Sequence, residues 1–490
     1  MFGVILSLYF MNKSLKEEAV TGLVWSSLER FAVQGIEFLV ILFLARLLTP
    51  NDFGLVGMLS IFIAIARSLV DSGFSQALIR KQRRTNNDNC TVFIFNVFVS
   101  ICLYCILFLA SPWVADFYNE PELCKLMRFM CFVIVIDSFS VVHRALFISK
   151  LDFKTQTKSS FISSSISGIL SIILAKLGFG YWALVSFQLV TSFFNTILLW
   201  YYSSWRPQLM YSYGSFKELF SFGSKLMLSG IIDTIYNNLY QIVIGKFFSA
   251  SSLGHFSQAK NFSQIPAATI TSILQRVTYP TLCRFQDNNE QLKDGYGKVL
   301  RISAFVFFPL MCGIAGVSSP LVHVLIGSKW EFASVLIVPL CFSMMWYPIH
   351  AINLSLLQVK GRSDIFLRIE IIKKVIGVII LFSTIPFGLT VMCWFRVVNA
   401  IISLAINTYY TGILIEWGFW QQFNAYFKSL ILSFLLFFVI FYSMSVFYDQ
   451  YIKLVVGILS GIFYVLLVVF LLKFREVDEI KSILAPLLRK

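Results

Sequence analysis

Apolar runs long enough to cross a lipid bilayer follow one another along almost the whole chain. A bilayer core is about 30 Å thick, so a helix needs about 20 mostly apolar residues to cross it. Such runs lie near 20–45, 53–79, 91–115, 123–148, 159–179, 181–202, 218–248, 253–280, 298–318, 333–359, 365–385, 388–412, 426–448 and 451–472. These runs predict an all-α integral membrane protein with about 14 transmembrane helices.

The low content of charged residues excludes a large water-soluble protein. Only 13% of the 490 residues are charged and 58% are hydrophobic, whereas soluble domains carry about 25% charged residues. A membrane barrel is also excluded, because its strands alternate between apolar and polar residues over about 10 positions. Runs such as 433–442 do not alternate.

The basic residues gather in alternate connecting segments and so predict the orientation in the membrane. With the N-terminus in the cytoplasm, most loop cations fall on that side, as the positive-inside rule requires. The cytoplasmic cations are Lys13, Lys16, Arg80, Lys81, Arg83, Arg84, Lys150, Lys154, Lys158, Arg206, Lys217, Arg284, Lys293, Lys298, Lys360, Arg362, Lys473, Arg475, Lys481, Arg489 and Lys490. The net charge of +15 therefore fits an anionic membrane leaflet and calls for no nucleic-acid partner. Both chain ends are expected in the cytoplasm, and either Met1 or Met11 could be the start.

Two similar polar turns indicate an internal repeat. ARLLTPNDFG (45–54) and GKFFSASSLG (245–254) each follow a long helical run, and Arg46, Thr49 and Gly54 match Lys246, Ser249 and Gly254. Six predicted spans separate the two copies, so both copies cross the membrane in the same direction, as in parallel-repeat transporters. We expect both turns at the outer face, where they meet when the protein opens to the cytoplasm.

The repeat divides the chain into two lobes of six spans related by a parallel pseudo-repeat, with two extra helices. The predicted segments are a cytoplasmic N-terminal segment (1–19), an N-lobe (20–202), a cytoplasmic linker (203–217), a C-lobe (218–412), the two C-terminal spans (426–472) and a cytoplasmic tail (473–490).

Cations inside the predicted spans are the strongest candidates for a binding site. Charges within a membrane are costly and usually face a protein interior or a cavity. The cations assigned to an anionic ligand are Arg30, Arg67, Lys225, Lys260 and Arg396, since Arg and Lys suit phosphate oxygens. The alternative is that they form structural ion pairs, for which the four-residue spacings Arg67–Asp71 and Glu370–Lys374 are suitable.

Further polar residues in the same spans are candidates for contacts to a glycan or to a coupling ion. They are Glu37, Asp71, Asp233, Asn237, Asn238, Gln241, Asn261, Gln264, Glu370, Lys373 and Lys374. The acids could couple transport to Na⁺ or H⁺, and no other cofactor is expected. The sequence holds no phosphate-binding G-x-x-x-x-G-K-[ST] loop, no G-x-S-x-G elbow and no H-E-x-x-H motif, and the histidines lack the spacing of metal ligands. We expect no catalytic residues and no metal site.

The N-terminal residues resemble those of a known family. LVWSSLERFAVQGIEFLVILFLARLLTPNDFGLVGM (23–58) and DSGFSQALIRK (71–81) are similar to the start of Wzx-type polysaccharide flippases of the multidrug/oligosaccharidyl-lipid/polysaccharide exporter superfamily. The resemblance implies a transporter of the bacterial inner membrane. Its cargo would be undecaprenyl-diphosphate-linked oligosaccharide for O-antigen lipopolysaccharide, capsule or exopolysaccharide, bound in a central cationic cavity.

The resemblance also implies residue roles and partners. Related lipid flippases use arginines of the first, second and eighth spans, where Arg30, Arg67 and Lys260 lie in this sequence. A polysaccharide polymerase and chain-length machinery would be partners.

Two other functions are alternatives for a chain of this kind. A cation-coupled multidrug exporter of the same superfamily would need acids in its cavity, whereas this chain offers mainly Arg and Lys. A membrane-embedded polymerase, ligase or glycosyltransferase would need a substantial loop or soluble part to carry its reacting groups, and the predicted connecting segments are short.

Overall fold

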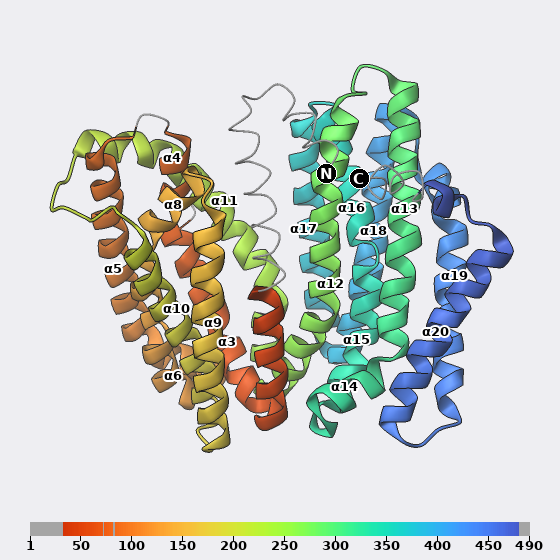
Figure 1. Ribbon diagram of the computed structural model, residues 1–490, viewed down its shortest axis with the longest axis horizontal. Coiled ribbons are helices and arrows are strands. Elements are labelled where there is room, and N and C mark those ends of the chain that lie inside the picture. Colours follow the sequence, from red (N-terminus) through yellow and green to blue (C-terminus); the bar gives the residue numbers. More distant parts are fainter. Residues whose placement is uncertain (1–32, 72, 82–83, 480–490) are drawn as a thin grey trace. The chain divides into compact units, whose positions relative to one another are not determined.

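The computed structural model describes residues 33–71, 73–81 and 84–479, and within these ranges every regular element is a helix (Figure 1). Nine of the described helical segments are long and apolar enough to cross a membrane, and a bent pair, Glu122–Ser138 with Val141–Ser149, would make a tenth. The predicted all-α membrane fold is confirmed. The N-terminal segment, with both possible starts and with Arg30, lies outside the described residues.

Contacts divide the described residues into two compact units with the boundary between Ser257 and Gln258, here called the N-terminal unit and the C-terminal unit. In the N-terminal unit residues 33–47 are helical. Its further helices are α3 (Pro50–Asp71), α4 (Phe74–Arg80), α5 (Asn86–Tyr118), α6 (Glu122–Met130), α7 (Phe132–Ser138), α8 (Val141–Ser149), α9 (Phe153–Lys176), α10 (Trp182–Tyr202), α11 (Tyr213–Phe247) and the first turns of α12 (Ala250–Cys283).

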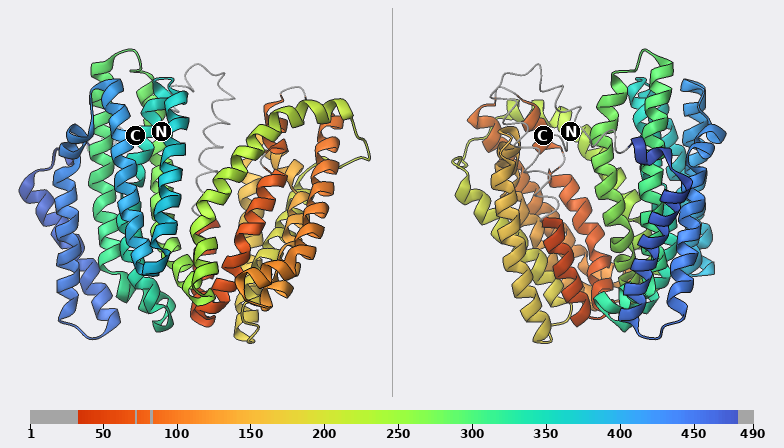
Figure 2. Two further views of the ribbon diagram at one scale, coloured as in Figure 1. Left: turned by 180° about the vertical axis from the view of Figure 1, so that it is seen from behind. Right: turned by 45° about the vertical axis from the view of Figure 1, so that its right-hand side comes forward.

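The C-terminal unit contains the rest of α12 and the last helices of the chain. These are α13 (Asn289–Gly316), α14 (Ser318–Ile326), α15 (Glu331–Met344), α16 (Tyr347–Val359), α17 (Ser363–Thr384), α18 (Leu389–Ile415), α19 (Phe419–Ser445) and α20 (Gln450–Leu472), with short 3₁₀ turns η2 (Ser328–Trp330) and η3 (Ile385–Phe387). Helices α19 and α20 pack side by side as an antiparallel pair (Figure 2).

Local sequence explains where several helices begin and end. Thr85 accepts a hydrogen bond from the Asp88 backbone N–H while the Asp88 carboxylate accepts one from the Thr85 N–H, so α5 starts with a capping box. Asp449 caps α20 in a related way. At the other ends, Asn119 and Lys473 adopt left-handed backbone angles, with φ of 56° and 43°, which stop α5 and α20.

Three predicted spans are helical but are not among the nine apolar ones. They are α11, α12 and α17, the helices that carry Lys225, Lys260 and Glu370. Charged and amide side chains make these three helices more polar than the others. The same helices carry many of the residues predicted to form a binding site. The count of 14 is compatible with these helices and stays a prediction.

Two predicted spans are interrupted. Residues 123–148 form α6, α7 and α8, and residues 333–359 form α15 and α16. Pro348 therefore lies in the first turn of α16, while residues 328–359 still count as one membrane-length segment. Proline fits that position because its missing N–H is not needed there.

Helix α11 packs against α3, α4 and α5, although the repeat assigns residues 218–248 to the C-lobe. The predicted lobe boundaries follow sequence repetition, which contacts do not measure, so they stay a prediction.

Candidate functional site

The two repeated turns have the same geometry at positions 200 residues apart. Helix α3 begins at Pro50 and α12 begins at Ala250. Before α3, the Thr49 N–H and hydroxyl donate to the Asp52 carboxylate at 2.8 and 2.7 Å. Before α12, the Ser249 hydroxyl donates to that of Ser252 at 2.9 Å and accepts from the Ser252 N–H at 3.1 Å. In both turns a Ser or Thr N-cap residue forms a side-chain hydrogen bond with the residue three positions later.

The starts of α3 and α12 touch through their backbones, within the N-terminal unit. A Cβ atom on Gly54 would stand 1.7 Å from the carbonyl oxygen of Ala250, and one on Gly254 would stand 1.9 Å from that of Pro50. The contact is reciprocal, as two related copies require. Only glycine allows such an approach, and small residues serve this purpose at helix crossings in membranes.

A second glycine contact lies between α4 and α11. A Cβ on Gly73 would be 2.5 Å from the Gly223 carbonyl oxygen, and one on Gly223 would be 2.7 Å from that of Gly73. Helix α11 is therefore held closely at two places, near its N-terminal turns by Gly73 and near its C-terminal end, where a Cβ on Gly245 would be 2.9 Å from the Tyr118 ring.

Arg67 forms an ion pair across two helices. Its Nε and Nη2 atoms both lie 2.8 Å from Oδ2 of Asp137 on α7. The Arg67 side chain is 41% exposed and that of Asp137 is 14% exposed. The four-residue spacing had pointed to Asp71, but the pair that holds the guanidinium in the described structure comes from a distant segment, which sequence spacing cannot indicate.

A cationic groove lies between α4 and α11, again within the N-terminal unit. Arg80, Lys81, Glu218 and Lys225 line a cavity of about 480 Å³. The Lys81 ammonium donates to Asp88 at 3.0 Å and to Glu218 at 2.8 Å. The hydrogen bond to Glu218, with further support from Asp88, raises the pKa of Lys81 above its usual value, so Lys81 stays charged.

The groove brings Lys225, a predicted site cation, together with Arg80 and Lys81, which the sequence places only in a cytoplasmic loop. Lys225 is exposed on it, and the Arg80 guanidinium lies 4.4 Å from the centre of the Phe222 ring, a cation–π contact. The motif DSGFSQALIRK contained Arg80 and Lys81 and was the available signal.

In the C-terminal unit two candidate cations come together. Lys260 on α12 and Arg396 on α18 lie close enough for their charges to interact, and the Lys260 side chain is partly buried. No helical spacing relates these two positions, because they lie 136 residues apart on different helices.

The candidates on α17 form a separate polar cluster. The Lys373 ammonium lies 2.5 Å from Oε1 of Glu370. This ion pair joins residues three positions apart, whereas the four-residue spacing predicts a pair between Glu370 and Lys374. Lys373 also lies near His350 on α16, whose Nδ1 is 3.2 Å from the Asn407 amide nitrogen.

The other predicted contacts are dispersed along their helices. Asn237, Asp233 and Gln264 are exposed, while Glu37, Asn238, Gln241 and Asn261 are partly buried. The Asn238 amide donates to the Thr234 carbonyl of its own helix at 2.8 Å. Asp71 closes α3, and its side chain lies outside the described part of the structure. The roles given to these residues stay predictions.

The fold can be compared with solved structures, and the sequence with known families. The fold is that of an all-helical membrane protein. It is similar to a structure titled "Lipid II flippase MurJ, inward closed conformation", with a TM-score of 0.71, 13% identity, and coverage of 92% of this chain and 100% of that one.

The sequence comparison then gives the family. The family described as "Polysaccharide biosynthesis protein" matches residues 43–336, and this chain belongs to it. Teichuronic acid biosynthesis protein TuaB of Bacillus subtilis (strain 168) is 25% identical over 426 residues, which are 86% of this chain and 87% of that protein. Lipopolysaccharide biosynthesis protein WzxC of Escherichia coli (strain K12) is 24% identical over 86% of this chain and 88% of its own. The predicted family resemblance is confirmed.

Proposed function

We propose that this protein carries lipid-linked oligosaccharides, bearing an undecaprenyl-diphosphate, across the membrane for surface polysaccharide synthesis. Its membership of the polysaccharide biosynthesis family and its similarity to proteins named for teichuronic acid and lipopolysaccharide biosynthesis support the proposal. A fold shared with a lipid flippase agrees with it.

The observation that carries the proposal is the match of residues 43–336 to the polysaccharide biosynthesis family. Two of the candidate cations, Lys260 and Arg396, lie close enough for their charges to interact. An anionic ligand between these side chains would be attracted by both charges. A diphosphate offers several acceptor oxygens, which an Arg can bind in pairs and a Lys can meet as a point charge. An organic cation would instead increase the repulsion, which disfavours the drug-exporter alternative.

The proposed mechanism is alternating access without chemical change in the cargo. The cations bind the diphosphate while the isoprenoid stays in lipid, and cargo binding must stabilise one conformation more than the other to drive the transition. We keep Arg30, Arg67 and Lys225, the other cations predicted from the sequence, as proposed contacts to a diphosphate. The acids Glu37, Asp71, Asp233 and Glu370 would bind a coupling Na⁺ or H⁺.

Location and partners complete the proposal. We assign the protein to the bacterial inner membrane with both termini in the cytoplasm, on the distribution of its basic residues. A polymerase and chain-length machinery would receive the cargo on the outer side.

The test is deletion of the gene in its host, with lipid-linked oligosaccharides measured by mass spectrometry and surface glycan measured alongside. Complete repeat units should accumulate on their lipid carrier, and surface glycan should fall. The wild-type gene should restore both, whereas Lys260→Ala and Arg396→Ala should not.

Lys453→Ala is the matched control, because this lysine lies in the first turn of α20, away from the candidate cations. It should complement fully at equal expression. Normal surface glycan and no lipid-linked intermediate, in a host without a second copy of such a transporter, would contradict the proposal, and efflux of organic cations would then be measured.

A further inference from the structure

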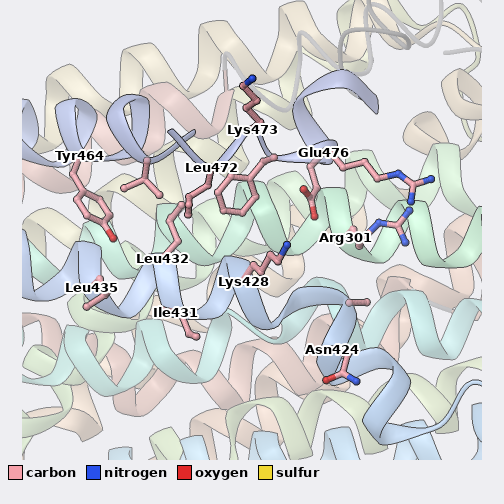
Figure 3. A pocket seen from close by; sticks show the side chains of 14 residues that line it. Arg301, Asn424, Lys428, Ile431, Leu432, Leu435, Tyr464, Leu472, Lys473 and Glu476 are labelled. Carbon is pink, nitrogen blue, oxygen red and sulfur yellow. The ribbon is translucent and has the colours of Figure 1, made fainter. Parts of the chain in front are cut away.

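A pocket with two different halves lies in the C-terminal unit, apart from the candidate cations described above. It is formed by α13, α19, the end of α20 and the turn that follows α20, and its volume is about 520 Å³. Figure 3 shows Leu435, Ile431 and Leu432 on one side and Lys428 and Arg301 on the other. The pocket therefore has an apolar wall next to a charged rim.

The apolar wall runs along two helices that pass the membrane test. Leu432 and Leu435 of α19 and Val468 and Leu472 of α20 line it. Leu435 is 51% exposed and Leu472 is 65% exposed, so the wall is accessible to an acyl chain lying between the two helices. Helices α19 and α20 are both apolar and long enough to span a bilayer.

The rim carries a net positive charge. Arg301, Lys428, Lys473 and Arg475 line the pocket together with the single carboxylate Glu476.

One nearby acid partly offsets these cations. Glu479 accepts a hydrogen bond from Arg301 at 2.8 Å and lies 3.5 Å from Arg475. Lys428 and Lys473 form no ion pair with any residue in the described ranges, and the buried Arg301 Nε has no hydrogen-bond partner among those residues. The excess charge is thus centred on these lysines.

The chain beyond α20 is held in a shape that keeps this rim in place. Lys473 has a left-handed φ of 43°, which ends the helix and turns the chain back. Phe474 is then 4% exposed, with its ring 5.3 Å from that of Phe305 on α13. This anchor holds Lys473 and Arg475 at the pocket, beside the N-terminal turns of α19.

We propose that this pocket binds an anionic phospholipid of the bilayer, with the phosphate at the basic rim and one acyl chain along the α19–α20 wall. A cationic rim next to an apolar wall at a helix end matches such a lipid, since basic residues near a membrane surface attract anionic headgroups and each buried methylene adds favourable burial energy. The pocket lies at the end of α20 where the predicted orientation puts the cytoplasmic leaflet. This lipid is a resident ligand and is distinct from the transported cargo.

The test measures binding of dioleoyl phosphatidylglycerol to the full-length protein by native mass spectrometry. Phosphatidylglycerol should bind more tightly than phosphatidylcholine of the same chain length, whose headgroup has no net charge. Lys428→Gln/Lys473→Gln should weaken phosphatidylglycerol binding by about 30-fold, from the usual contribution of two basic residues near a surface. Lys453→Gln, a neutralisation at the other end of α20, should leave it unchanged.

Since the double variant could fail to fold, Lys428→Gln alone is the second variant, with an expected loss of about fivefold. The Lys428 side chain is exposed, so this change should be tolerated. Equal binding of the two lipids, or unchanged binding in both variants, would overturn the proposal.

Two competition arms identify the source of the phosphate. Inorganic phosphate at the same concentration should not displace phosphatidylglycerol, because it makes no use of the apolar wall. Undecaprenyl phosphate should displace it no better than phosphatidylglycerol displaces itself. Displacement by inorganic phosphate would make this a free-anion site, and preferential displacement by undecaprenyl phosphate would make it a cargo site, and either result would refute the proposal.

Discussion

The cations of the two units differ in what surrounds them. In the N-terminal unit Arg67 is held by Asp137 and Lys81 is shared between Asp88 and Glu218. In the C-terminal unit Lys260 has a second cation, Arg396, as its electrostatic neighbour. The first arrangement pairs each cation with a carboxylate, whereas the second places two cations within reach of each other's charge.

The difference separates two uses of charge inside a membrane. A paired cation fixes the position of helices and presents its remaining hydrogen-bonding atoms in a defined direction. Two neighbouring cations attract an anion more strongly than either does alone. We therefore expect substitutions in the first group to affect stability before transport, and substitutions in the second to affect transport before stability.

The largest effect is expected at Lys260 and Arg396. Lys260→Ala should lower transport by about tenfold to a hundredfold, the usual value of a lost hydrogen bond to a charged group, while removing repulsion and so leaving the melting temperature unchanged or higher. Transport would be measured as accumulated lipid-linked oligosaccharide in complemented cells. Lys260→Arg is the charge-retaining control, and a loss of stability in Lys260→Ala without loss of transport would reverse the comparison.

The second prediction concerns the Arg67–Asp137 pair. Arg67→Ala leaves a mostly buried carboxylate without this partner, so the free energy of unfolding should fall by about 1–3 kcal/mol. The exchange Arg67→Asp/Asp137→Arg should recover much of that loss, as measured by thermal unfolding in detergent. Failure of the exchange to recover stability, together with normal stability of Arg67→Ala, would show that the pair is not structural.

The two repeated turns depend on a close backbone contact at their glycines and not on paired charges. Gly54→Ala or Gly254→Ala should lower the free energy of unfolding by about 1–3 kcal/mol, because the new methyl group overlaps a backbone carbonyl. Gly313→Ala is the matched control inside a helix, since a Cβ at Gly313 meets no atom within 4 Å, and it should be neutral or stabilising by about 0.5–1 kcal/mol. Equal melting temperatures for all three variants would contradict the close contact.

The smallest effect is expected at an exposed ion pair. Lys293 lies 2.7 Å from Glu416, and the hydrogen bond from Lys293 lowers the pKa of Glu416 below its model-peptide value of 4.5. Since the carboxyl pKa is lower in the folded state, the pair stabilises the protein above that value, and its contribution is lost as the pH falls through the folded pKa.

Glu416→Gln should therefore melt slightly lower than the wild type at neutral pH. The two melting temperatures should converge in acid. A difference that stays constant across the titration would mean that the glutamate acts through something other than its charge.

The sequence predicted the helical membrane fold because the apolar runs are long and the charge content is low. It also predicted the matching turns, since Thr49 and Ser249 are both strong N-cap residues and both turns end on glycine. The family followed from the residues around these turns. These features depend on neighbours along the chain, which a sequence displays directly.

The partners of the charged residues could not be predicted in this way. Asp137 is 70 positions from Arg67, and Arg396 is 136 positions from Lys260, so no helical spacing relates them. The pocket above α19 depends on the backward turn at Lys473 and on the burial of Phe474, and neither is visible as a pattern. Helix packing determines these contacts, and it leaves little trace in local sequence.

The reciprocal contact at Gly54 and Gly254 restricts how the two copies of the repeat can diverge. At these positions any side chain overlaps the partner backbone, so a change in one copy cannot be absorbed by the other. The caps beside them face no such limit, because Thr49–Asp52 and Ser249–Ser252 already solve the same problem with different residues. Among related chains, variation should therefore be greatest in the cap residues and least in the two glycines.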